Sequence, residues 1–317
     1  MPTPTIPGLD VPRAKRYSRI KLAALLLNTA LSFARLGWFA GSGHSARLRD
    51  KTQDVAPDPR LATPAYVAAY GVLSWLAGLP FAYVTGHVVE RRFDLTKQGT
   101  PAWLRDAAKG LVVTLALEVP AATVSYAVIR RRPRDWWLIL AGATVPLLVI
   151  LGQFAPVLIL PLFNKFEPIR DRVLADRVKD LGKRAGVPIA DVLRVDMSRQ
   201  TEKPNAFFAG IGHTKRIVLS DTMLDRFSPS EVDAVVAHEL GHQAHGDIWR
   251  LTALFAGMGT GSAYAIHRLA PPLFDRAAPR TGVRGLGDVA GFPLFELLGG
   301  LLGFVALPLQ NAVSRAI

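Results

Sequence analysis

Cysteine is absent from the 317-residue chain, so disulfide bonds and metal sites built from thiolates are both excluded. Acidic residues are scarce relative to basic ones: 25 Asp and Glu stand against 38 Lys and Arg, and the formal net charge is +13. In a soluble protein such a charge would suggest nucleic-acid binding. Here the basic residues cluster beside long apolar runs, a pattern typical of anchoring at lipid headgroups. We therefore expect a lipid bilayer as a partner and no nucleic acid.

The apolar runs predict a polytopic membrane protein. Mean hydropathy is +0.23 although 20% of the residues are charged, so apolar and charged residues must be segregated along the chain. We predict a disordered basic N-terminus at 1–18, an N-terminal membrane domain with four spans at 19–163, and two further spans within 249–317. The length of each apolar run suggests about six transmembrane helices, with approximate bounds 22–40, 65–86, 110–129, 136–163, 251–266 and 292–310.

Residues 164–248 lack any apolar run long enough to cross a bilayer, and they predict an extramembrane domain. An amphipathic helix is expected at 171–185, and short strands at 191–196 and 216–219. The predicted fold class is therefore mainly α, a polytopic membrane protein that carries an α+β extramembrane domain. Six spans would place both termini and this domain on one side of the membrane.

The candidate chemistry lies in the sequence His238-Glu239-Leu240-Gly241-His242, on an apolar run that favours a helix. The segment Ser228–Glu231 supplies the signals of a helix start. Histidines four residues apart lie ~40° apart around a helix and ~6 Å apart along it, so both imidazoles can converge on one metal ion. Glu239 lies beside them and can handle a proton. The pattern predicts one Zn²⁺ per chain bound by His238 and His242, with Glu239 as the catalytic base. The alternative is a helix with two incidental histidines and a solvated glutamate.

A catalytic zinc ion needs a third protein ligand. The metzincin pattern would place Gly at 245 and His at 248, whereas this chain has His245 and Ile248, so that class is excluded. His245 shares a helix face with His238 but lies ~10 Å farther along the axis. We expect it to support the site or the helix end rather than to bind the ion. Asp247 either orients a ligand histidine or is simply solvated.

Several sequence blocks together resemble the integral-membrane CAAX prenyl proteases and their bacterial relatives, which are zinc metalloendopeptidases. The resemblance runs from about residue 60 to the end. It is densest in Arg92–Gln98, Pro161–Pro168, Asn205–Gly210, Lys215–Thr222 and Asn311–Arg315. It implies a ring of membrane helices around an intramembrane chamber, with the zinc site at the catalytic end.

The resemblance also implies roles in substrate binding. Asn205 and Ala206 would belong to an edge strand that pairs with the substrate backbone, although Pro204-Asn205 also fits a turn. Arg216 would contact a substrate carbonyl or form a structural salt bridge. In the family the third zinc ligand is a glutamate three residues after a Ser-Arg pair, which here would be position 318. We therefore expect a sequence truncated before the third ligand, and a chain impaired in zinc binding and catalysis as written.

The expected function is a membrane-embedded, zinc-dependent endopeptidase of the CAAX-protease type. Its substrates would be peptides or proteins, lipid-modified ones included. The expected location is a bacterial cell membrane, with the catalytic domain in the cytoplasm. Two alternatives stay open: a quality-control protease for membrane proteins with the same chemistry, and a pseudoprotease that binds peptide or lipid.

Overall fold

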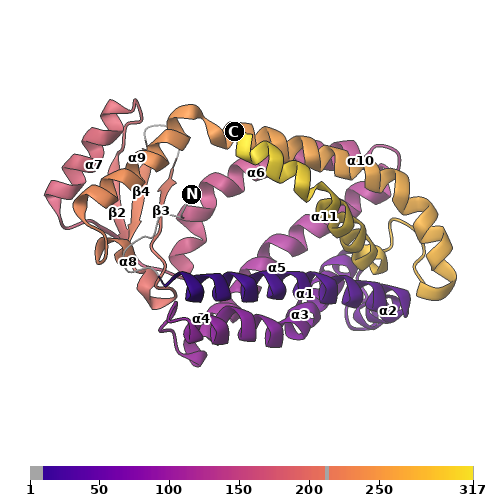
Figure 1. The fold of residues 1–317 in the computed structure, drawn as a ribbon. Helices are drawn as coiled ribbons and strands as arrows, with labels where there is room; N and C mark the ends of the chain where they lie inside the picture. Colours follow the sequence, from indigo (N-terminus) through magenta and orange to yellow (C-terminus); the bar gives the residue numbers. More distant parts are fainter. Residues whose placement is uncertain (1–9, 211–213, 317) are drawn as a thin grey trace, which may run out of the picture.

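The computed structural model describes residues 10–210 and 214–316. Long helices form an elongated ring, and a small α/β domain lies at one end of it (Figure 1). Around the ring α3 packs on α5, α5 on α6, α6 on α10, α10 on α11 and α11 on α1, while α2 joins α1 to α3. The ring architecture implied by the resemblance is thus confirmed. Its helices are α1 (Val11–Gly41), α2 (His44–Val55), α3 (Pro59–Tyr83), α5 (Thr100–Arg131), α6 (Trp136–Leu158), α10 (Asp247–Thr281) and α11 (Phe292–Ala316).

Helix α3 continues through a π-helical turn, Val84–Val88, into the short helix α4 (Val89–Arg92). Four helices of the described residues are long and apolar enough to cross a membrane, and α6 with the turn that follows it makes a fifth, bent by 43°. The expected span at 251–266 is not among these helices of the described residues. Helix α10 exists and has 35 residues, but a run of Gly, Thr and Ser at 257–262 lowers its hydropathy. The expected fold class, a mainly α polytopic membrane protein, is confirmed.

The expectation of disorder is wrong for residues 11–18. Helix α1 begins at Val11, where the carboxylate of Asp10 accepts a hydrogen bond from the N–H of Arg13 at 2.9 Å. Two contacts with the α4 end of the ring hold these first turns. Arg13 pairs with Asp94 at 2.5 Å, and the Tyr17 hydroxyl donates to Glu90 at 2.7 Å. The predicted disorder at residues 1–9 lies outside the described residues.

The α/β domain is built on a four-stranded sheet of order β1-β2-β4-β3. Strands β2 and β4 are parallel, and the two outer pairs are antiparallel. The strands are β1 (Phe166–Pro168), β2 (Asp191–Val195), β3 (Ala206–Ala209) and β4 (Arg216–Ser220). The expected helix and both expected strands are present, within a residue or two of the predicted bounds.

One face of this sheet is covered by two helices, α7 (Arg172–Arg184) and α9 (Pro229–His245) (Figure 1). The short helix α8 (Asp221–Leu224) connects β4 to α9. The buried core between the sheet and the helices is aliphatic. It includes Val178, Val192, Ile217, Leu219 and Val236, each no more than 1% exposed. This core fixes the orientation of α9, the helix that carries the histidine motif.

Candidate metal centre

Local sequence rules set the start of α9. The Ser228 hydroxyl accepts a hydrogen bond from the N–H of Glu231, and the Glu231 carboxylate accepts one from the N–H of Ser228, so the predicted capping box is formed. The helix then buries Val232, Val236 and Leu240 against the sheet. Because His238 and His242 each follow a buried position by two residues, they lie on the opposite, exposed face.

The two histidines converge. The Nε2 atoms of His238 and His242 lie 3.3 Å apart, and their rings are inclined at 78°. Two nitrogens bound to one tetrahedral zinc ion, at about 2.0–2.1 Å each, would be about 3.3–3.4 Å apart. The side chains therefore already have the separation that a shared zinc ion requires.

The other nitrogen of His242 has a defined partner. Its Nδ1 lies 2.8 Å from Oδ2 of Asp247, so an Nδ1–H donated to this carboxylate leaves the Nε2 lone pair free for a metal ion. Gly246 ends α9 with φ 68° and ψ 30°, and Asp247 is the first residue of α10. This left-handed turn brings the largely buried carboxylate back toward His242. Of the two roles left open for Asp247, the geometry supports orientation of the histidine.

Glu239 is half-buried, and its carboxylate forms no ion pair or hydrogen bond with any residue in the described part of the chain. A free carboxylate next to the two imidazoles can accept a proton. His245 is the exposed last residue of α9. Within residues 10–210 and 214–316, no third His, Asp or Glu completes a cluster that could hold a metal ion. The expected glutamate at 318 lies outside these residues.

The strand expected to meet substrate is at the edge of the sheet. β3 pairs with β4 on one side, and no described strand pairs with its other side. Asn205 extends this ladder: its N–H donates to the Ser220 hydroxyl at 2.8 Å, and its carbonyl accepts from the Ser220 N–H at 2.9 Å. The structure therefore favours the strand over the turn at Asn205. Ala206, the first residue of β3, is buried, and α9 packs along the strand.

Arg216 lies at the other end of β3, where it pairs with Ala209. Ala209 is four residues from Asn205, so Arg216 lies ~13 Å from Asn205 along the strand direction. Its exposed side chain forms no ion pair with a described residue, so the structural salt bridge expected for it is not present among those residues. Arg216 instead lines a cavity of about 410 Å³ between the sheet and the end of α6.

Sequence reasoning missed the polar cluster that supports the approach to β3. Glu90 accepts hydrogen bonds from Tyr17 and Lys21, and its second oxygen pairs with Lys203 at 3.0 Å. Burial alone would lower the pKa of Lys203, but its contacts with Tyr17 and Glu90 raise it. The cluster ties α1 and α4 to the segment just before Asn205. Glu90 lies two residues before the block Arg92–Gln98, and the sequence contained no local signal for these contacts.

Two family models together match almost the whole chain. Residues 4–165 match "CAAX prenyl protease N-terminal, five membrane helices", and residues 168–316 match "Peptidase family M48". The boundary between the matches lies at the start of β1, where the ring gives way to the α/β domain.

Individual relatives agree with these matches. The chain is 29% identical to a protein named uncharacterized metalloprotease YhfN from Bacillus subtilis, over 95% of this chain and 71% of that protein. It is 34% identical to CAAX prenyl protease 1 of Saccharomyces cerevisiae over 54% of this chain, and 31% identical to the Arabidopsis thaliana homolog over 77%. It spans only 38% and 56% of those two proteins. The crystal structure of S. mikatae Ste24p shares the fold, with a TM-score of 0.80 at 22% identity, over 98% of this chain and 76% of that one.

Proposed function

The chain is an integral membrane member of peptidase family M48, and from that membership we propose that it is a zinc-dependent endopeptidase. The observation that carries the proposal is the 3.3 Å separation of the two Nε2 atoms of His238 and His242. That separation matches two ligands of one tetrahedral zinc ion. Only nitrogen and oxygen ligands are available, since the chain has no cysteine.

In this proposal each residue of the motif has one task. His238 and His242 hold the zinc ion, and Asp247 fixes the ring of His242 through Nδ1. When bound, the ion supplies Lewis acidity at the scissile carbonyl. Glu239 takes a proton from the attacking water and delivers it to the leaving amine.

The substrate backbone would pair with the free edge of β3, beginning at Asn205 and Ala206. This edge is suitable because its other side is fixed to β4 and α9 lies beside it. An extended peptide added there would run past the histidine motif. Arg216, at the far end of β3, would contact a substrate carbonyl or carboxylate that continues beyond the strand.

We place the protein in a bacterial cell membrane with the α/β domain in the cytoplasm, and its substrates among peptides and proteins, lipid-modified ones included. The name of the yeast relative refers to prenylated substrates. The name of the B. subtilis relative, which the match covers more fully, does not. That difference keeps a quality-control protease with the same chemistry as the second candidate.

The test uses the full-length protein in lipid nanodiscs, with peptide substrates that differ only in a farnesyl group. Glu239→Gln should retain zinc and lose about 10²–10⁴-fold in kcat, the usual contribution of a general base. His242→Ala should lose zinc as well. Asp233→Asn, on the same helix but paired with Arg177, is the matched control and should keep both zinc and activity.

Each of these measurements has an outcome that contradicts the proposal or favours one of the alternatives. Activity that survives Glu239→Gln rules out the proposed base. Zinc binding without turnover in the unmodified protein would favour the pseudoprotease. Equal kcat/KM with and without the farnesyl group would favour the quality-control protease.

A further inference from the structure

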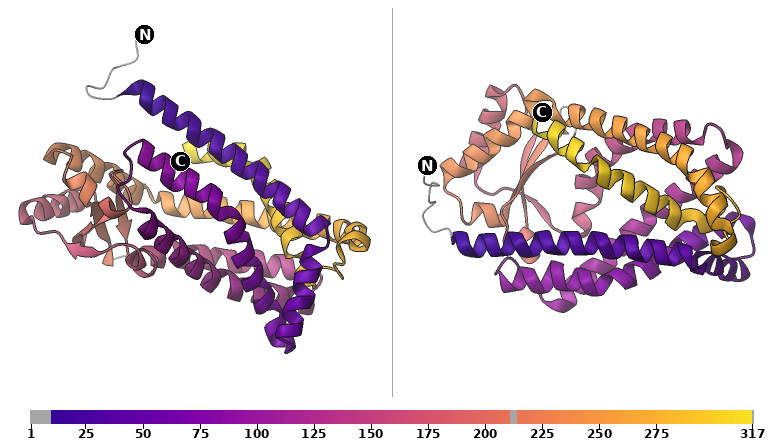
Figure 2. Two further views of the ribbon diagram at one scale, coloured as in Figure 1. Left: turned by 90° about the horizontal axis from the view of Figure 1, so that it is seen from below. Right: turned by 45° about the vertical axis from the view of Figure 1, so that its right-hand side comes forward.

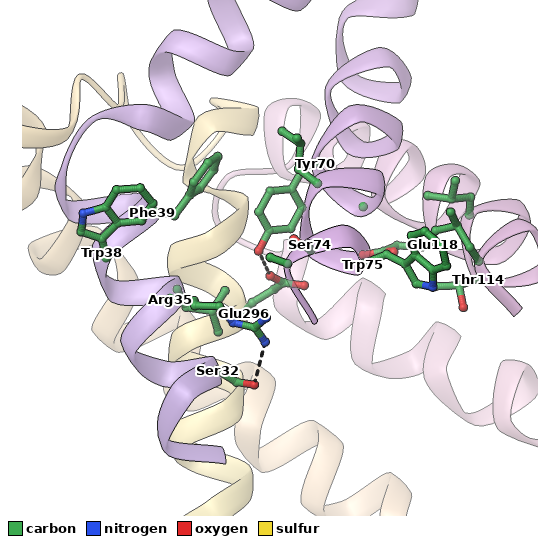
Figure 3. Close-up of a pocket in the computed structure, with 16 residues that line it drawn as sticks. Ser32, Arg35, Trp38, Phe39, Tyr70, Ser74, Trp75, Thr114, Glu118 and Glu296 are labelled. Atoms are coloured by element: carbon green, nitrogen blue, oxygen red, sulfur yellow. Dashed lines mark hydrogen bonds between the residues drawn. The ribbon is translucent and has the colours of Figure 1, made fainter. Parts of the chain in front are cut away.

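A cavity of about 460 Å³ opens between α1, α3, α5 and α11, and we call it the ring cavity (Figure 3). The α1 residues that line it lie between Ser32 and Phe39, in the C-terminal half of that helix. This half of α1 lies toward the end of the ring opposite the α/β domain (Figure 2). The ring cavity therefore lies apart from the histidine motif, and what it binds is independent of the function proposed above.

The ring cavity contains more carboxylates than cations. Glu118 from α5 and Glu296 from α11 both line it. The Tyr70 hydroxyl donates to Glu296 at 2.5 Å, whereas Glu118 has no hydrogen bond or ion pair with a described residue. Arg35, the one cation among the lining residues, reaches toward Glu296 (Figure 3) but donates to Ser32 at 3.2 Å instead. Carboxylates held among membrane helices without a cationic partner are costly, so the site favours a positively charged occupant.

The walls of the cavity favour a particular kind of cation. Phe39, Tyr70 and Trp75 present aromatic rings, and leucines complete much of the remaining surface. Aromatic ring faces attract ammonium groups, and more strongly when water is excluded. Carboxylates combined with aromatic rings suit an organic ammonium ion better than a small hydrated metal ion, which needs many oxygen ligands.

The mouth of the cavity suggests how such a ligand would enter. Trp38 and Leu73 both line it, yet they are 62% and 47% exposed. They belong to α1 and α3, two of the candidate membrane spans. The cavity therefore continues onto the apolar outer surface of the ring, which a bilayer would cover.

We propose that the ring cavity binds a cationic amphiphile, with the ammonium head between Glu118 and Glu296 and the hydrocarbon chain passing out between α1 and α3. Two carboxylates against one guanidinium give the site a preference for positive charge. The aromatic walls shield the head from water, and the apolar mouth accommodates the chain.

The lack of native cysteine makes this proposal directly testable. Ser74→Cys, which lines the cavity, introduces a single thiol into the full-length protein in nanodiscs. Its labelling rate is measured with a trimethylammonium-ethyl methanethiosulfonate and with the matching sulfonate reagent. Each rate is divided by that of Ser230→Cys, an exposed position in the first turn of α9. We expect the cationic reagent to react about tenfold faster or more, and Glu118→Gln with Glu296→Gln to bring the ratio close to one.

A second experiment measures how strongly two ammonium compounds slow the labelling, and so distinguishes an amphiphile from a small ammonium ion. Hexadecyltrimethylammonium should slow labelling of Ser74→Cys at least about fivefold, with tetramethylammonium at the same concentration having little effect, because the apolar mouth contributes to binding. The doubly substituted Gln protein should lose this protection. If Ser74→Cys fails to fold, Thr114→Cys from α5 lines the same cavity and replaces it.

Several outcomes overturn the proposal. Equal labelling rates with the cationic and the sulfonate reagent, in the protein that carries only Ser74→Cys, would show that the cavity has no preference for cations. A preference that survives both Gln substitutions would show that the two carboxylates do not cause it. No labelling by either reagent shows that the cavity is closed to ligands. Equal protection by tetramethylammonium assigns the site to small ammonium ions and refutes the amphiphile.

Discussion

Replacing Asp247 with alanine should weaken zinc binding by about 10–100-fold, the usual effect of losing a partner that orients a ligand histidine. The structure supports this magnitude. The Nδ1 of His242 contacts only the Asp247 carboxylate, at 2.8 Å, and a hydrogen bond to a charged group contributes about 1.5–3 kcal/mol. At 1.4 kcal/mol for each factor of ten, that range corresponds to roughly one to two orders of magnitude in Kd.

The assay is a zinc competition titration with a chromophoric chelator, on the full-length protein at constant pH. Asp247→Asn is the conservative variant: it keeps an acceptor oxygen but loses the charge, so its Kd should fall between those of the wild type and of Asp247→Ala. Because Asp247 also begins α10, circular dichroism and thermal unfolding of each variant show whether the helix has been lost. Asp233→Asn, on α9 but paired with Arg177 of α7, is the control.

The reasoning would be refuted if Asp247→Ala bound zinc within twofold of the wild type while remaining folded. It would also fail if Asp233→Asn weakened binding as much as Asp247→Ala. If Asp247→Ala loses both zinc and helix while Asp247→Asn stays folded, the test rests on the Asn variant alone. That variant then has to show a weaker Kd by itself.

Three further predictions concern stability. Ser228→Ala removes the N-cap of α9 and should lower the free energy of unfolding by about 0.5–2 kcal/mol, measured by urea denaturation of the detergent-solubilised protein; an unchanged midpoint would contradict it. Gly246→Ala places a side chain at φ 68° and should lower the free energy of unfolding by roughly 1–2 kcal/mol. It should also weaken zinc binding. A variant as stable as the wild type would show that the turn does not require glycine. Burial alone would raise the pKa of Asp221, but hydrogen bonds from Ser198 and from the backbone of Thr222 hold it below its ordinary value. The stability that ionised Asp221 contributes should therefore be complete above pH ~4 and be lost as the pH falls through the lowered pKa. The unfolding temperature, measured across pH 2–6, should depend less on pH in Asp221→Asn than in the wild type. Parallel curves for the two proteins would refute this prediction.

The parts of the fold that follow from local rules were predictable. The start of α9 depends on Ser228, Pro229 and Glu231, all within four residues, so the sequence alone indicated it. The same is true of the convergence of His238 and His242, which follows from their spacing on a helix. The amphipathic pattern of α7 and the short apolar strands β2 and β4 were equally readable.

The remaining features depend on contacts between distant parts of the chain. Helix α1 begins at a local cap from Asp10, but the contacts of its first turns with Asp94 and Glu90 join distant parts of the chain, and no local pattern reports them. Helix α10 packs along α6 and α11, and the local sequence of α10 does not report which helices it contacts. The support of β3 by Glu90 and the meeting of Glu118 with Glu296 in one cavity likewise require the folded ring.

The short length of β3 has a consequence for how a peptide would be held. The strand has four residues, and alternate residues face an added strand, so it offers about four main-chain hydrogen bonds. At about 0.5–1.5 kcal/mol each, these bonds hold a peptide only weakly. Main-chain pairing also repeats every two residues, so a bound peptide can shift by two positions and form the same bonds. Such a strand fixes the direction of the chain without fixing which bond is cut, and a single cleavage position would have to be defined by side-chain contacts outside the strand.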